Sequence, residues 1–151
     1  MAPTLTAHLD AADDIVAIRA LLQDLERAYH AKHAEAIARL YTADARIADL
    51  APPLMRRGLD PAAVQAWLDG WQGPVRITAR DTEVQADGDL AVAYGLELTR
   101  VTTGDGEHVA WWSRATFVFA RTPEGWRITH QHNSVPFHMD GSFRAAIDLE
   151  P

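Results

Sequence analysis

The sequence predicts an α+β fold in which a curved antiparallel sheet packs on three N-terminal helices. Two observations support this class. In the first half of the chain, apolar residues recur every three or four positions, which is the period of a helix that buries one side. From Val75 onward they alternate with polar residues, which is the period of a strand. Helices followed by a run of strands are typical of α+β proteins rather than of parallel α/β sheets.

Length and composition indicate a single domain over residues 1–151, with a polar arm at 1–12 and a C-terminal tail at 137–151. The net charge of −7 and the lack of a basic run argue against nucleic acid as a partner. The chain contains no cysteine, which excludes disulfides and thiolate chemistry. No apolar run reaches the roughly 20 residues of a membrane span, and no secretory signal is visible. We therefore expect a cytoplasmic protein that makes no contact with membranes.

The three helices are defined by their apolar stripes and their end signals. The first carries one stripe at steps of three and four residues (Ile15, Ile18, Leu22, Leu25 and Tyr29). A short second helix is expected over Ala34–Tyr41, followed by a brief strand over Ala45–Leu50 that a proline pair closes. The third helix begins after Asp60, a favourable N-cap that Pro61 follows, and ends at one of two later glycines.

Four long strands joined by hairpin turns follow the third helix. They are expected over Val75–Gln85, Leu90–Val101, Val109–Arg121 and Trp126–Pro136. Glycine-containing turns separate them, which favours antiparallel neighbours. The second and third of these strands carry large apolar residues on both faces, whereas the helices can cover only one face. We therefore expect a second copy of the chain to cover the other face, which gives a homodimer.

Two segments, EAIARLYTADARIAD (Glu35–Asp49) and RATFVFARTPEGWRITHQHNSVPF (Arg114–Phe137), carry a resemblance to known proteins. Together with the order of the elements, they resemble the nuclear transport factor 2-like superfamily. That superfamily includes ketosteroid isomerases, SnoaL-like polyketide cyclases and the association domain of calmodulin-dependent kinase. The resemblance implies a cystatin-like α+β barrel, with a cone-shaped sheet, a pocket at its open end and a dimer across its back. Because this fold hosts unrelated activities, the resemblance says less about function.

Asp49 is the first candidate for acid–base chemistry. The resemblance to ketosteroid isomerases places their general-base aspartate on this position. A carboxyl group at a strand end beside apolar residues is also partly desolvated, which suits a group that takes and returns a proton. The alternative is an aspartate that caps a turn. The oxyanion tyrosine and the neutral aspartic acid of those isomerases fall near Leu25 and Ala115, which cannot replace them, so we do not expect steroid isomerisation by that mechanism.

The last predicted strand contains His130 and His132, which share one face because they are two residues apart. If this face lines the pocket, either histidine could act as a general acid or base. If Gln131 and Asn133 line the pocket instead, the histidines lie at the dimer seam. We favour the first arrangement. A metal site would need a third ligand beside the two histidines, for which Glu97 or Asp49 is a candidate, but hydrogen bonding is the more common role of such a pair and we expect no metal site.

Further candidates for substrate binding are two aromatic residues, one cation and the two amides of the last strand (Tyr94, Trp111, Arg114, Asn133 and Gln131). Arg114 interrupts an apolar strand, so it either pairs with Glu97 or clamps an anionic group. These residues favour a small-molecule pocket protein, such as a cofactor-free isomerase, cyclase or lyase that acts on a small apolar carbonyl compound. The alternative is a non-catalytic dimeric ligand-binding or association module.

Overall fold

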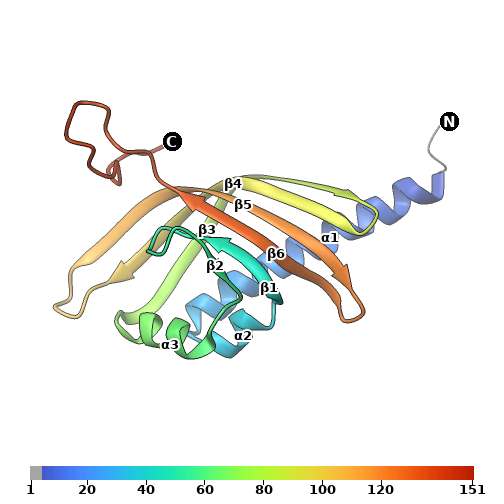
Figure 1. Ribbon diagram of the computed structural model, residues 1–151, viewed down its shortest axis with the longest axis horizontal. Helices are drawn as coiled ribbons and strands as arrows, with labels where there is room; N and C mark the ends of the chain where they lie inside the picture. Colours follow the sequence, from blue (N-terminus) through green and yellow to red (C-terminus); the bar gives the residue numbers. More distant parts are fainter. Residues whose placement is uncertain (1–4) are drawn as a thin grey trace.

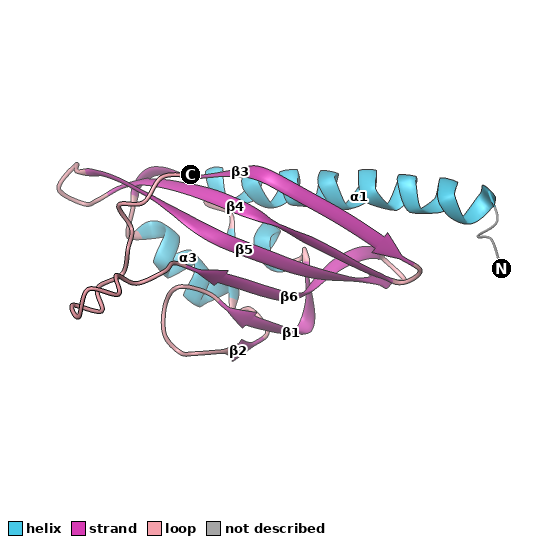
Figure 2. Ribbon diagram, turned by 90° about the horizontal axis from the view of Figure 1, so that it is seen from above, coloured by secondary structure: helices cyan, strands magenta, loops and turns pink. Residues whose placement is uncertain are grey.

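The computed structural model describes residues 5–151, which form three helices and a curved six-stranded sheet (Figure 1). In chain order the elements are α1 (Leu5–His30), α2 (Ala34–Ala38), β1 (Tyr41–Ala48), β2 (Arg56–Arg57), α3 (Pro61–Asp69), β3 (Gln72–Asp87), β4 (Leu90–Thr102), β5 (His108–Thr122) and β6 (Gly125–Ser134). Figure 2 shows α1 running along one side of the sheet. The predicted α+β fold class is confirmed.

Helix α1 is longer than its apolar stripe predicts. The polar arm expected over residues 1–12 is wrong from Leu5 onward, where the chain is already helical, and residues 1–4 lie outside the described residues. Leucine and alanine are frequent in this stretch, and both favour helix even where no stripe is visible. Within residues 5–151, no helix combines the length and the apolar content that a membrane crossing requires.

The strand order is β2-β1-β6-β5-β4-β3, and neighbours are antiparallel except for β1 and β6, which run parallel. The four predicted hairpin strands are all present as β3 to β6. Strand β1 begins at Tyr41 rather than at the predicted Ala45, and α2 is correspondingly short. Helix α3 has the predicted start, because the Asp60 side chain accepts a hydrogen bond from the Ala62 amide at 3.0 Å.

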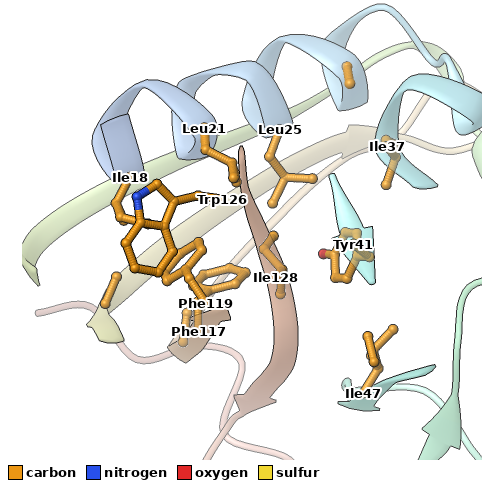
Figure 3. Packing of buried hydrophobic residues seen from close by; sticks show 14 of the residues in the cluster. Ile18, Leu21, Leu25, Ile37, Tyr41, Ile47, Phe117, Phe119, Trp126 and Ile128 are labelled. Atoms are coloured by element: carbon orange, nitrogen blue, oxygen red, sulfur yellow. The ribbon is translucent and has the colours of Figure 1, made fainter. Parts of the chain in front are cut away.

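The main core lies between α1 and the sheet (Figure 3). Ile18 and Leu25 from the helix are buried against aromatic residues of β5 and β6, including Phe119 and Trp126. The indole nitrogen of Trp126 donates to Asp14 at 3.1 Å, which ties the end of the sheet to α1. We call the sheet face toward the helices the inner face and the opposite one the outer face.

A β-bulge in β6 decides which of its residues face inward. Opposite Val118 and Phe119 of β5 stand His130 and Ile128, so Thr129 is an extra residue in β6. Ile128 is fully buried on the inner face, and beyond the bulge the buried residue is Asn133. The bulge therefore interrupts the strict alternation that the sequence predicts for this strand.

The C-terminal tail leaves the end of β6 as a loop that projects beyond the sheet (Figure 1). An isolated bridge pairs Phe137 with Ala145, and Ala146 is buried. Several apolar side chains of the tail are exposed (Phe137, Met139, Phe143, Ile147 and Leu149).

Candidate functional site

A cavity of about 300 Å³ lies between the inner face of the sheet, helices α1 and α3, and the segment that follows β1. Much of its wall is aromatic (Tyr29, Trp67, Trp71, Trp111 and Phe117). Small residues on the strands, among them Gly95 and Ala115, leave this space open. A concave, mostly apolar cavity with a few polar groups is the usual form of a small-molecule site.

Glu97 of β4 is the most strongly perturbed carboxyl group of the cavity wall. Its side chain is half-buried, and Asn133 Nδ2 donates a hydrogen bond to Oε2 at 2.9 Å. Burial raises the pKa of Glu97 to about 7, against the opposing effect of the Asn133 hydrogen bond, and the nearby Glu26 adds to the rise. A carboxyl group with this pKa can both accept and return a proton near neutral pH.

A line of hydrogen bonds supports Glu97 from strands β1 and β6. Asn133 Oδ1 accepts from Gln131 Nε2, and Gln131 Oε1 accepts from the hydroxyl of Tyr41. Gln131 and Asn133 line the cavity as the sequence allowed, because the bulge turns both toward the inner face. Burial raises the pKa of the Tyr41 phenol well above its usual value, so this hydroxyl keeps its proton.

Tyr29 of α1 lines the same cavity. Burial, and then the negative charges of Glu97 and Asp49, raise the pKa of its phenol. Tyr29 is therefore a neutral hydrogen-bond donor in a region that also holds two carboxyl groups. Asp49 and Glu97 both line this cavity, so the two carboxyl groups belong to one site.

Asp49 lies on the cavity wall but is already engaged. Its Oδ1 accepts from the Ala51 amide at 3.1 Å, and the Arg56 guanidinium lies 3.1 Å from its carboxylate. The turn-capping role is thus present in the structure, and the ion pair compensates the charge. The catalytic role of Asp49 stays a prediction.

His130 and His132 do not line the cavity, so the arrangement favoured from the sequence is wrong. The bulge at Thr129 is the physical reason, since it turns both imidazoles to the outer face. There the rings lie 6.4 Å apart, and His130 Nδ1 is 2.8 Å from the Arg46 carbonyl oxygen. In the part of the chain that the structure describes, no three His, Asp or Glu side chains converge as metal ligands would.

Of the other predicted contacts, Trp111 lines the cavity and Arg114 does not. Arg114 is exposed, and its Nε donates to the Ser134 hydroxyl at 3.0 Å, so neither the clamp nor the pairing with Glu97 exists. Tyr94 borders the cavity, but its hydroxyl donates to Glu83 at 2.7 Å in an exposed position. The hydroxyl is thus engaged outside the cavity, and the role of Tyr94 in substrate binding stays a prediction.

Glu97 and Tyr29 were not predicted as site residues, although the sequence carries a signal for the first. Glu97 shares a strand face with Ala91, Ala93 and Gly95, which are small or apolar. A lone carboxylate among small residues on a helix-covered face marks a place where a cavity and a desolvated acid coincide. Tyr29 carries no such signal, because it continues the apolar stripe of its helix.

A curved sheet wrapped on a long helix, with an apolar cavity between them, defines an NTF2-like protein of cystatin-like fold. Residues 18–138 match the model of the SnoaL-like domain, and the chain belongs to this family. No curated protein matches the chain.

Solved structures agree with this assignment. An NTF2-like protein of unknown function from Pseudomonas putida KT2440 is 28% identical, with a TM-score of 0.81 over 93% of this chain and 99% of that one. An NTF2-like protein with a cystatin-like fold from Novosphingobium aromaticivorans is 25% identical, with a TM-score of 0.70 over all of both chains. A proposed dehydratase of the NTF2-like family from Streptomyces avermitilis is 19% identical, with a TM-score of 0.72 over 82% and 97%. This last likeness concerns the fold alone.

Proposed function

We propose that the cavity binds a small, mostly apolar carbonyl compound and that Glu97 transfers a proton to and from it, as in a cofactor-free isomerase, cyclase or lyase. One observation carries the proposal. The carboxyl group of Glu97 has a pKa of about 7 and lies on the wall of a mostly apolar cavity. Glu97 thereby takes the role that the sequence had assigned to Asp49.

The chemistry follows from the neighbours of Glu97. The ionised carboxylate takes a proton from a carbon next to the carbonyl group, and negative charge develops on the carbonyl oxygen. The neutral phenol of Tyr29 donates a hydrogen bond to that oxygen, and the apolar walls strengthen this interaction by keeping water away. The protonated Glu97 then returns the proton to another carbon or to a leaving group. Asn133 holds the carboxyl group in place throughout.

Deuterium exchange tests proton abstraction without knowledge of the natural substrate. The protein is incubated in D₂O with 2-tetralone or 2-cyclohexen-1-one, and deuterium at the carbons next to the carbonyl group is followed by NMR. We expect the wild type to accelerate the exchange over buffer, and Glu97→Gln to lose about 100-fold or more of this rate. Glu83→Gln is the matched control, because Glu83 lies in an exposed position on β3 and binds Tyr94.

Binding of the same ketones is measured in parallel by ligand-observed NMR. Ketone binding in both variants, with exchange lost only in Glu97→Gln, supports the proposal. If Glu97→Gln exchanges deuterium at the wild-type rate and Asp49→Asn loses this exchange, then Asp49 and not Glu97 is the base. Binding without exchange in the wild type would favour the non-catalytic ligand-binding module.

We also propose that the chain forms a homodimer through the outer face of the sheet. Directly opposed residues of a ladder share a face, and this places an apolar group at the centre of the outer face (Val92, Leu96, Leu98, Trp112 and Val118). The helices do not cover it, and Tyr94 and Leu90 are 39% and 59% exposed there. Exposed arginines surround the apolar centre (Arg46, Arg57, Arg80, Arg100 and Arg114). An apolar centre with arginines around it is typical of protein interfaces.

A further inference from the structure

The three hydrogen bonds that lead to Glu97 all have the same direction. Tyr41 donates to the oxygen of Gln131, the nitrogen of Gln131 donates to the oxygen of Asn133, and the nitrogen of Asn133 donates to Glu97. Tyr41 and Asn133 are buried, with 7% and 9% of their surface exposed. Each amide has a donor end and an acceptor end, so one reversed amide would force the next one to reverse as well.

The direction of this series matters for the charge on Glu97. In the observed direction Asn133 offers an N–H group, which suits an ionised carboxylate. In the reverse direction Asn133 would offer its oxygen, which suits a protonated carboxyl group. The reverse direction would also deprive the Tyr41 hydroxyl hydrogen of its Gln131 acceptor, in a buried position where an unpaired donor is costly.

We propose that Tyr41 is a positioning residue of the cavity, whose hydroxyl fixes the orientation of Gln131 and Asn133 and thereby the hydrogen bond that Glu97 receives. Tyr41 touches neither the cavity nor Glu97 and acts through the two amides. Its effect is to favour the ionised form of Glu97, which is the form that takes a proton. The catalytic meaning of this effect rests on the proposed function, whereas the hydrogen-bond series does not.

Other groups around Glu97 set the remainder of its electrostatic environment. Helix α1 contributes Glu26 and Tyr29, and the segment from β1 to β2 contributes Asp49 and Arg56. Glu26 opposes ionisation of Glu97, while the Asp49 and Arg56 charges are paired with each other. Asn133 alone of these neighbours donates a hydrogen bond to the Glu97 carboxylate in the described structure. The direction of that amide is therefore the property through which Tyr41 can act.

The pKa of Glu97 is measured directly by ¹³C NMR of the labelled side-chain carboxyl group, assigned by comparison with Glu97→Gln. We expect Tyr41→Phe to raise this pKa by about one unit, because the Asn133 amide is no longer held with its donor toward the carboxylate. Gln131→Met, which removes the intermediate amide, should raise it similarly. The double variant should show no further rise, since both changes interrupt the same series.

Thr42→Val is the matched control. Thr42 is adjacent to Tyr41 on β1, and its hydroxyl is buried without a hydrogen-bond partner in the described structure. Its removal deletes a hydroxyl from the same strand and should leave the pKa of Glu97 at the wild-type value. If Tyr41→Phe does not fold, Gln131→Met tests the same series from its next member.

A wild-type pKa of Glu97 in folded Tyr41→Phe or folded Gln131→Met would overturn the positioning role. The ketone exchange assay gives a separate answer about the proposed function. A raised pKa in Tyr41→Phe, with full exchange in Glu97→Gln, would keep the positioning role and reject Glu97 as the base. If both proposals hold, the pH profile of exchange in Tyr41→Phe shifts upward with the pKa.

Discussion

The acid–base property of Glu97 comes mainly from the burial of its side chain. Burial is the largest cause of its raised pKa, and the charge of Glu26 is a smaller one. The small side chains beside it and the aromatic walls of the cavity produce this burial. A substitution that only rearranges charges near Glu97 should therefore change its pKa less than one that lets water in.

The raised pKa makes a prediction for the pH dependence of stability. The folded pKa of about 7 lies above the ordinary value of 4.5, so between these pH values the folded chain holds more protons than the unfolded chain. The stabilising contribution of Glu97 to folding is fully present below pH 4.5 and is lost as the pH rises through 7, which amounts to about 3 kcal/mol between pH 4.5 and pH 8. Glu97→Gln should lack this loss.

The loss of stability that Glu97 causes is measured by urea unfolding of the wild type, Glu97→Gln and Glu83→Gln at pH 4.5 and pH 8. The difference in unfolding free energy between the two pH values should be smaller in Glu97→Gln by about 3 kcal/mol. Glu83→Gln should behave as the wild type. Equal pH dependence in all three proteins would show that Glu97 titrates at an ordinary pKa.

At the scale of single elements, the bulge in β6 shows what periodicity can and cannot predict. The alternation of polar and apolar residues correctly located β6, but it placed His130 on the same face as Ile128. One extra residue at Thr129 reverses every position that follows it. The two alternatives for the strand were visible in the sequence. The choice between them depends on how β6 pairs with β5, and local sequence does not contain that information.

The candidate site was only partly predictable from the sequence. Regular alternation or the family resemblance was enough to name Trp111, Gln131 and Asn133 as candidates, and all three line the cavity. Glu97 becomes an acid–base group only when helix packing closes a cavity over its strand, which is a property of the assembled fold. The likeness to ketosteroid isomerases gave Asp49, and Asp49 does lie in the cavity.

A kink in β3 explains why β4 has a glycine at its centre. The β3–β4 register shifts between Arg80 and Glu83, and Asp81 adopts a φ of 53°. A Cβ atom on Gly95 would lie 2.9 Å from the Arg80 carbonyl oxygen and 2.9 Å from the Thr82 Cα atom. These are backbone atoms, which cannot move aside without moving the strand. The residue must therefore be glycine for β3 to bend over the cavity.

Gly95→Ala should accordingly destabilise the protein by about 1–3 kcal/mol, the usual cost of overpacking. Gly104→Ala is the matched control, because a Cβ atom there would meet nothing within 4 Å. Urea or thermal unfolding of both variants measures the difference. Equal stability of Gly95→Ala and the wild type would mean that β3 relaxes freely, and the kink would then have no structural role at this position.

At the scale of the whole molecule, the order of helices and strands was sufficient to predict the fold, since each half of the chain has one clear period. The proposed dimer rests on a different property of the same strands. Strands β4 and β5 have apolar residues on both faces, and the helices cover only the inner face (Figure 2).

The arginines around the outer apolar centre would repel those of a second copy unless acidic groups lie between them. The C-terminal tail carries Asp148 and Glu150, and residues 147–151 line a hollow with Arg80 and Arg100 on the outer face.

Leu98→Arg tests the proposed dimer at the centre of this face. Leu98 stands between Trp112 and Thr78 in the ladder, and an arginine there would bring a charged side chain into the apolar centre of the proposed interface, where its desolvation is costly. In sedimentation velocity at micromolar concentration, the wild type should have twice the mass of the chain and Leu98→Arg the mass of one chain. Leu54→Arg is the control, since Leu54 is 98% exposed in the loop between β1 and β2 and should leave the dimer intact. A wild-type monomer would reject the dimer, and a dimeric Leu98→Arg would place the interface elsewhere on the molecule.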